Sequence, residues 1–558
     1  MLGLRAIDIV VLISYFLVIA AIGIISTRLI RNREDFVLGG RRFGKILMAL
    51  FTFGAGTHAE SAVGVASQSY KVGFAGIWYQ WVMLFTMPIY WLLAPVFRRA
   101  RVLTTADFFE RRFGSRFMLL YASFALFVLI SMTGVMLYGS AKMVEALTGG
   151  AISWQLSILI IAGVSFTYGI AGGLVAAVWN DFFQGILTIV MSLLIIPFFW
   201  SHIGGLHGFQ SALADPQETF KLVLSKDMTL FWIVAVSVNS LFSMVVQPHI
   251  MACTAAAKND LDSSVGFVGG NLIKRVMTVP WALAGVMAIA YFGSGKIDPD
   301  HAFGAMAREM LPAGFAGLML ACVMASVMDN CAISMLTFSG IYTNSIHRRI
   351  VTRARSEAQL VGVGRLAGLV FGVVTIVLSF FFTDVPAAMR FLWTTIPLMG
   401  VPFFLGLLWK RANRTGAFVG FAAALIAMLV GQYRLGWVGD AGLPKVITLF
   451  LSTGILAGVV ASLLTKPEPK SLINAFFLLL RTPVGGEEVL RRAGYVEIPG
   501  TGTFEMPAKW PEEDQIDVPL GSTDNFRRPV IIGFFVVCII TLALLGAVRL
   551  LAAWLAGG

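Results

Sequence analysis

The chain has 558 residues, of which 58% are hydrophobic and 13% charged, and its net charge at pH 7 is +12. A soluble domain carries about 25% charged residues, so this composition excludes an ordinary soluble protein. Apolar stretches of about 20 residues, the length of a membrane-spanning helix, recur along the chain, and they are too long for the strands of a membrane barrel. The basic residues lie in the short loops between these stretches, which is typical of the positive-inside rule and argues against a nucleic-acid partner.

The apolar stretches predict an all-α polytopic membrane protein with about 14 transmembrane helices. In chain order, we expect them at 7–27, 43–69, 74–97, 117–145, 152–170, 173–200, 228–252, 264–293, 314–346, 359–382, 386–409, 415–433, 446–465 and 530–553. Basic loops follow the first and third spans and therefore face the same side, which the positive-inside rule makes cytoplasmic. This count places both termini outside the plasma (inner) membrane.

The second span, 43–69, contains the stretch Phe53–Gly64, in which three glycines accompany His58 and Glu60. Glycine weakens a helix, and an ionisable group inside a bilayer is costly. Irregular backbone at membrane depth occurs where it lines a polar cavity or is sheltered by protein. The stretch therefore predicts a helix break at which a solute or an ion binds. The structural alternative is a Glu60 that forms an ion pair between helices.

Further polar side chains lie inside the later apolar spans. Gln80 lies between two aromatic residues in the third span, and Asp181 opens the sixth, where it would also serve as a helix cap. Lys274 and Arg275 lie well inside the eighth span, although long side chains of this kind can also extend to the membrane surface. Each of these residues is a candidate for binding a solute or an ion.

In the ninth span, Ser326 and Asp329 are three residues apart and so share one helix face. A hydroxyl and a carboxylate supply the hard oxygen ligands that suit Na⁺. A serine in a membrane helix more often donates to its own i−4 carbonyl, but a neighbouring buried aspartate favours the ion site. The four cysteines show neither disulfide nor zinc spacing.

Several stretches together resemble the sodium:solute symporter family, which includes sodium cotransporters of sugars, proline and sialic acid. The order and spacing of these stretches cover most of residues 1–465. The matching segments are Asp35–Arg42, Leu103–Gly114, Tyr168–Leu174, Trp179–Gln184, Ala255–Lys258, Trp409–Gly416 and, in some members, Thr482–Gly485.

The resemblance implies the leucine-transporter-like fold, a five-plus-five inverted repeat whose discontinuous helices meet near the membrane midplane. One extra helix precedes the repeat and others follow it. The chain would then divide into an N-terminal helix and loop (1–42), a transport core (43–411), two peripheral helices (412–465), a cytoplasmic linker that starts with a helix at the membrane interface (466–529), and a final transmembrane helix (530–558).

The resemblance also implies a sodium site between the broken second span and the ninth span. Its ligands would be backbone carbonyls at Gly54 and Thr57, the carbonyl of Cys322, and hydroxyls at positions 325 and 326. This chain keeps Ser326 but has Ala325, so one hydroxyl ligand is missing.

Some members bind a second sodium through an aspartate that matches Asp181 and hydroxyls that match positions 325, 328 and 329. Here these positions are Ala325, Met328 and Asp329, so hydroxyls are lost and a carboxylate is gained. Either Asp329 completes a sodium site, or protons replace sodium through Asp329, Asp181 or His58. The sodium interpretation is the one we favour.

For the solute, the resemblance implies contacts from Glu60, Ser61, Gln80 and Lys274, with a gate that includes Asn239 and Ser243. We therefore expect a Na⁺-coupled symporter that imports a sugar, amino acid or carboxylate by alternating access. It would be a monomer or weak homodimer, with neither an enzyme activity nor a cofactor other than Na⁺. The alternatives are a proton-coupled symporter, a passive channel, and a membrane solute sensor that works with a separate signalling protein.

Overall fold

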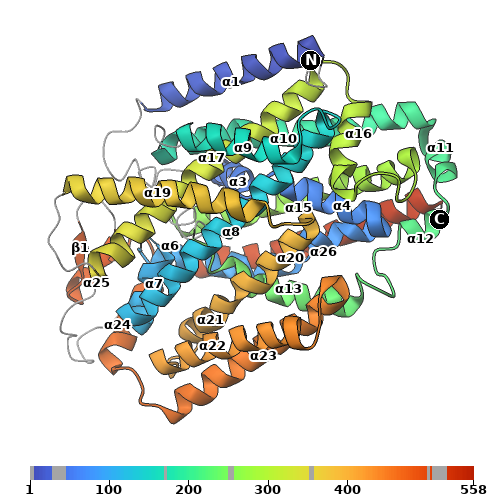
Figure 1. Ribbon diagram of the computed structural model, residues 1–558. Helices are drawn as coiled ribbons and strands as arrows, with labels where there is room; N and C mark the ends of the chain where they lie inside the picture. Colours follow the sequence, from blue (N-terminus) through green and yellow to red (C-terminus); the bar gives the residue numbers. More distant parts are fainter. Residues whose placement is uncertain are drawn as a thin grey trace.

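The computed structural model describes residues 5–27, 45–102, 104–168, 173–248, 257–350, 357–498, 503–505 and 524–557. The described residues form a bundle of long helices (Figure 1). Ten helices are long and apolar enough to cross a membrane, and four shorter apolar helices accompany them in the described part. The prediction of a helical polytopic protein is confirmed, whereas the count of about 14 spans and the inverted repeat remain predictions.

The helical elements of the first half, in chain order, are α1 (Ala6–Thr27), α3 (Lys45–Ala55), α4 (Ala59–Val72), η2 (Gly73–Ile77), α5 (Trp78–Trp81), η3 (Leu84–Thr86), α6 (Met87–Arg99), α7 (Thr105–Phe113), α8 (Ser115–Leu147), α9 (Trp154–Tyr168), α10 (Gly173–Ile203), α11 (Gly205–Ala212), α12 (Pro216–Thr219) and α13 (Leu230–Met244). The matching segment 35–42 and residues 169–172 and 255–256 of two others lie outside the described residues.

The elements of the second half are α15 (Asp260–Phe292), η4 (Pro299–His301), α16 (Ala302–Met310), α17 (Phe315–Ile341), η5 (Tyr342–His347), α18 (Arg348–Ile350), α19 (Glu357–Ser379), α20 (Val385–Thr395), η6 (Ile396–Met399), α21 (Gly400–Leu408), α22 (Arg414–Leu429), η7 (Val430–Arg434), α23 (Gly439–Leu464), α24 (Lys470–Arg481), α25 (Glu487–Arg492), β1 (Val496–Ile498), β2 (Thr503–Glu505) and α26 (Asp524–Ala556).

The third span is less regular than the uninterrupted helix predicted over 74–97. Short turns, η2, α5 and η3, precede the regular helix α6. Gly73 has a φ of +77°, a conformation that side chains disfavour, and this ends α4. Pro88 lies in the first turn of α6, where its missing N–H costs no helix hydrogen bond. The irregular turns place Tyr79, Gln80 and Trp81 beside the centre of the bundle.

Helix α15 packs against both halves of the broken span through small residues. A Cβ at Gly270 would lie 2.5 Å from the carbonyl oxygen of Ala49 in α3, and one at Gly285 would lie 2.4 Å from that of Ala66 in α4. Such small residues allow close backbone approach between membrane helices. Lys274 and Arg275 lie between these two contacts, so α15 presents both basic side chains at the level of the break.

Both chain ends lie at one end of the bundle, the end that carries α11, α12 and α16 (Figure 1). Asp8 in α1 accepts a hydrogen bond from the backbone of Gly314 at 2.7 Å, and Gln210 in α11 donates to the carbonyl of Leu555 at 3.1 Å. We call this the outer end, following the orientation expected from the charges; the orientation itself remains a prediction.

At the opposite, inner end, α24 packs against α6 and α7 and leads to α25 and a β-hairpin. The hairpin pairs Val496 with Glu505 in antiparallel register and is the only departure from an all-α fold in the described residues. Two strands of three residues are too short to give a clear period-2 pattern, which is why the sequence indicated only a partly ordered linker there.

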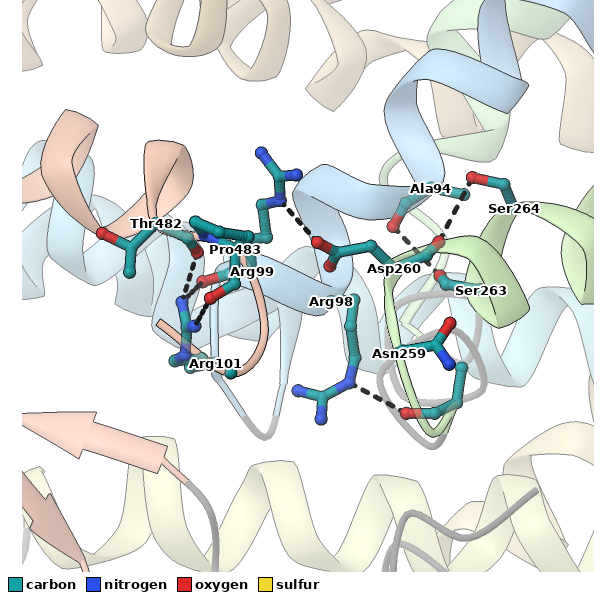
Figure 2. A network of polar contacts seen from close by, with 12 residues as sticks. Ala94, Arg98, Arg99, Arg101, Asn259, Asp260, Ser263, Ser264, Thr482 and Pro483 are labelled. Atoms are coloured by element: carbon teal, nitrogen blue, oxygen red, sulfur yellow. Dashed lines mark hydrogen bonds and ion pairs between the residues drawn. The ribbon is translucent and has the colours of Figure 1, made fainter. Parts of the chain in front are cut away.

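Arginine side chains hold the inner end together, as Figure 2 shows. Arg99 forms an ion pair with Asp260 at the start of α15 at 3.0 Å. Arg101 donates to the carbonyls of Thr482 and Pro483 at 3.0 and 2.7 Å and pairs with Glu487 at 2.9 Å. These contacts attach the segment after α24 to the α6–α7 corner.

Candidate functional site

The predicted helix break is present between α3 and α4, at Gly56, Thr57 and His58. The amide of Thr57 donates to the carbonyl of Gly54 at 3.2 Å, and His58 has an extended backbone with φ −122° and ψ 176°. A helix end leaves carbonyl groups without partners inside the helix, and a helix start leaves amides. Carbonyl groups at the end of α3 and amide groups at the start of α4 therefore both lie at the break.

Helix α17 contacts the break through Ser326 and Asn330. The Ser326 hydroxyl lies 3.5 Å from the carbonyl oxygen of Thr57 and 3.3 Å from Nδ1 of His58. Nδ2 of Asn330 lies 3.4 Å from the same His58 nitrogen and donates to the carbonyl of Ser326 at 3.0 Å. Thr57 and Ser326, two of the expected ion ligands, therefore lie side by side.

Asn330 was missed at the sequence level, although a signal existed. It lies four residues after Ser326, so both project from one face of α17. The neighbouring Asp329 carries a charge and is the stronger candidate by sequence alone. The side chains of Asp329 and Asp181 lie outside the part of the chain that the structure describes.

Two further groups near the break differ in whether they have hydrogen-bond partners: the carbonyl of Cys322 has them, and the hydroxyl of Thr57 has none among the described residues. The carbonyl of Cys322 accepts a hydrogen bond from Gln184 in α10 at 3.2 Å, and its sulfur lies 3.4 Å from the hydroxyl of Thr188. Cys322 lies inside α17, where its carbonyl also accepts the helical hydrogen bond from the amide of Ser326, so both of its lone pairs already have donors. The Thr57 hydroxyl is buried and has no hydrogen-bond partner among the described residues.

Glu60 begins the first turn of α4, where the helix dipole favours a carboxylate. Its Oε1 accepts from the Ser61 hydroxyl at 3.4 Å, and its Oε2 is buried without a described partner. Helix α8 approaches closely here because it has a glycine: a Cβ at Gly139 would lie 2.5 Å from the Cβ of Glu60. Close packing against α8 therefore positions the Glu60 side chain, and its Oε2 has no hydrogen-bond partner among the described residues.

The two basic residues of α15 contact the break and α5. Lys274 donates to the carbonyl of Gly56, and Arg275 donates to the backbone carbonyl of Gln80 and, at 3.1 Å, to its side-chain oxygen. The indole of Trp81 in turn donates to the carbonyl of Arg275 at 2.8 Å. Neither side chain extends to the membrane surface, since Lys274 is bound at the break and Arg275 is 1% exposed.

Asn239 and Ser243 lie on α13, away from these contacts. The Asn239 amide donates to the carbonyl of Trp393 in α20 at 2.7 Å, and both residues are buried. No contact in the described residues joins either side chain to Glu60 or Lys274. The structure therefore brings Glu60 and Ser61 near Lys274, places Gln80 against Arg275, and leaves the expected gate residues on α13.

A network of polar contacts joins the helices between the break and the outer end. The Tyr79 hydroxyl donates to Asp440 at 2.7 Å and accepts from Arg390 at 2.7 Å, while Arg390 and Asp440 pair at 3.0 Å. Gln68 in α4 adds a contact to Asp440 at 3.4 Å, and the Tyr79 ring packs on Trp393. Four elements, α4, α5, α20 and α23, are joined here, and periodicity gave no sign of this because the residues are far apart in sequence.

The chain is similar to known transporters. The model of the sodium:solute symporter family matches residues 36–424. The osmoregulated proline transporter OpuE of Bacillus subtilis (strain 168) is 25% identical over 495 residues, covering 83% of this chain and 96% of the relative. The sodium/glucose cotransporter of Vibrio parahaemolyticus is 24% identical over 464 residues, covering 76% of this chain and 84% of the relative.

Among solved structures, a Na⁺-coupled sialic acid symporter in a substrate-bound outward-open state is similar, with a TM-score of 0.70 and 19% sequence identity. The match covers 83% of this chain and 99% of that protein, which shows a shared fold. Because the family match spans well over half of the sequence, this chain belongs to the sodium:solute symporter family.

Proposed function

We propose that this protein imports a small organic solute together with Na⁺ by alternating access. The observation that carries the proposal is the contact at the helix break, where the Thr57 carbonyl and the Ser326 hydroxyl lie 3.5 Å apart between α3–α4 and α17. A cation bound by both groups would join the two helices. Family membership supports Na⁺ as the coupling ion.

The proposed ion site uses oxygen ligands from both sides of this contact. They are Gly54, Thr57, Cys322 and Ser326, with the carboxylates of Asp329 and Asp181 as further ligands. Neutral carbonyl and hydroxyl dipoles suit a hard monovalent cation. Ala325 supplies no hydroxyl, and the imidazole of His58 lies beside Ser326 instead. His58 is therefore the residue that would distinguish this ion site from those of its relatives.

The proposed solute site lies on the other flank of the break and consists of Glu60, Ser61, Gln80 and Lys274, with Asn239 and Ser243 on the neighbouring α13. Lys274 binds the Gly56 carbonyl directly beside the ion site, so ion and solute share one stretch of backbone. Ion binding would favour the conformation in which this stretch fits the solute. A ligand shifts such an equilibrium only through its different affinities for the two conformations.

Proton-coupled symport is the second candidate, and one observation favours it. Nδ1 of His58 lies 3.3 Å from the Ser326 hydroxyl, so an imidazolium would place a positive charge where Na⁺ is proposed to bind. Histidine is the side chain that ordinarily changes charge near neutral pH.

Uptake into proteoliposomes tests both candidates. Radiolabelled sugars, amino acids and carboxylates are offered under an inward Na⁺ gradient, and the same solutes are offered under a pH gradient with choline in place of Na⁺. We expect accumulation of at least one solute with the Na⁺ gradient and none above protein-free liposomes with the pH gradient alone. Equal uptake in choline that follows the pH gradient would replace sodium coupling by proton coupling.

A further inference from the structure

Arg275 is a buried cation whose hydrogen bonds are incomplete. Its side chain is 1% exposed and lies between α15 and α5. Nη1 donates to both oxygens of Gln80, whereas among the described residues Nη2 contacts only the sulfur of Met83, at 3.5 Å, and Nε has no partner. No carboxylate of the described residues forms an ion pair with it. The protein thus supplies acceptors for one end of the guanidinium only.

The unused donors form one edge of the guanidinium. The N–H bonds of Nε and Nη2 point in parallel from the same side of the planar group, and this is the edge that binds a carboxylate through two hydrogen bonds. The described contact of Nη2 is with the thioether of Met83, a weak acceptor on a flexible side chain. A carboxylate bound at this edge would offer stronger acceptors in its place.

Charge at the site also favours an anion. Lys274 and Arg275 are neighbours, and the described carboxylate whose charge acts on Lys274 is that of Glu60. Glu60 therefore offsets the charge of Lys274, whereas no described carboxylate is paired with Arg275, and an unpaired charge in a region of low dielectric is strongly unfavourable. Entry of Na⁺ on the other flank adds positive charge, and an anionic solute would offset it.

Arg275 lies at the proposed solute site because of the residues it joins. Its neighbour Lys274 reaches the helix break, and Gln80, which holds its guanidinium, follows Tyr79 in the short helix α5. The Tyr79 ring packs on Trp393 and Trp232 at centroid distances of 4.9 and 6.0 Å. The guanidinium thus contacts α5 at the residue next to this aromatic cluster.

We propose that the solute is a small organic carboxylate and that Arg275 binds its carboxylate through the Nε–Nη2 edge, while Gln80 orients the guanidinium. This inference rests on the proposed symport function and specifies its substrate class. The assignment concerns recognition alone and requires no chemical change of the solute.

The test uses the full-length protein in proteoliposomes and follows ²²Na⁺ uptake stimulated by unlabelled solutes. In each matched pair a carboxylate is replaced by a neutral group: lactate and lactamide, propionate and propionamide, glucuronate and glucose. We expect at least one acid to stimulate ²²Na⁺ uptake tenfold or more above its neutral partner. Stimulation by neutral partners that equals or exceeds that of the acids would overturn the carboxylate assignment and leave sodium symport standing. Stimulation by none of the solutes would contradict the proposed function itself.

Gln80→Glu tests the part played by Arg275 without removing the buried cation. The new carboxylate would lie at the position of the present side-chain oxygen, 3.1 Å from Nη1, and would neutralise the guanidinium from inside the protein. We expect the preference for acid over neutral partner to fall about tenfold or more, with Na⁺ half-saturation changed less. Gln210→Glu adds the same charge at the outer end and should leave the preference unchanged. An unaltered preference in Gln80→Glu would show that Arg275 is structural.

Discussion

The two flanks of the helix break differ in the charge of the groups that meet there. Toward α17, the described groups at the break are a carbonyl, an imidazole, a hydroxyl and an amide, with contacts of 3.3 to 3.5 Å around Ser326 and His58. Toward α15, the groups are charged, and Glu60 and Arg275 each keep a buried atom without a described partner. Neutral oxygen dipoles suit a small cation, whereas unpaired charged atoms suit a polar solute. The difference indicates that one break serves two ligands.

The largest expected effect comes from a change that displaces both flanks at once. Gly139→Ala places a Cβ 2.5 Å from the Cβ of Glu60 and 2.7 Å from its Cα, so the first turn of α4 must move. Because that turn follows Thr57 and carries Glu60, we expect Na⁺-dependent uptake to fall about a hundredfold or more. Gly340→Ala in α17 meets nothing within 4 Å and is the matched control. Size-exclusion chromatography checks folding, and full uptake by Gly139→Ala would show that the contact with α8 does not position the site.

Glu60→Gln removes a charge from the α15 flank and leaves the groups on the α17 flank unchanged. The substitution keeps the shape of the side chain but removes its charge beside Lys274. Hydrogen bonds to charged groups contribute about 1.5–3 kcal/mol, so we expect KM for the solute to rise roughly tenfold or more. The Na⁺ concentration for half-maximal uptake should stay within about twofold. A large change in Na⁺ dependence with constant KM would reverse the assignment of the two flanks.

Asn330→Ala makes the complementary change on the α17 flank. The amide contacts His58 at 3.4 Å and the Ser326 carbonyl at 3.0 Å, and neutral hydrogen bonds contribute about 1 kcal/mol each. We expect the Na⁺ concentration for half-maximal uptake to rise about three- to fivefold, with KM for the solute nearly constant. Kinetics at several Na⁺ concentrations measures both quantities. If neither changes, Asn330 does not orient the ion site.

The smallest effect on transport is expected at the inner end, outside both flanks. Burial would raise the pKa of Glu487, but the hydrogen bond and charge of Arg101 lower it below its usual value. A carboxyl whose folded pKa is lowered stabilises the fold above its unfolded pKa of about 4.3, and this contribution disappears as the pH falls through the folded pKa. We expect residues 482–492 to keep their protection from hydrogen exchange between about pH 8 and 5 and to lose it below about pH 4.

Glu487→Gln should weaken this protection between about pH 8 and 5, where Glu487 is ionised, while uptake changes less than about twofold because Glu487 lies at the inner end, away from both flanks. Protection that is already lost near pH 6 in the unchanged protein would contradict the lowered pKa. A strong loss of uptake would instead connect the inner end to the transport site.

Features that depend on local sequence were accessible from the sequence. Apolar length predicted the spans, and glycines beside His58 and Glu60 predicted the break, which the structure contains. The resemblance paired Thr57 with Ser326, and the structure places them in contact, although their binding of an ion remains a proposal.

Features that depend on how helices rotate against one another were not accessible. The network joins Tyr79 to Arg390 and Asp440, which follow it by 311 and 361 positions, and no local pattern in the sequence connects the three residues. The free edge of Arg275 likewise becomes visible only when the partner atoms on Gln80 and Met83 are known. Hydrophobic periodicity indicates which face of a helix is apolar, but it does not indicate which residues pack against that face.

Binding of ²²Na⁺ to the purified protein tests the central claim, a Na⁺ site at the contact between the helix break and α17. Ser326→Ala removes the hydroxyl 3.5 Å from the Thr57 carbonyl, and Ser123→Ala removes an exposed hydroxyl on α8 that donates to its own helix. We predict saturable binding by the unchanged protein and by Ser123→Ala, and a dissociation constant about tenfold or more higher in Ser326→Ala. Equal Na⁺ affinity in all three proteins would contradict the account.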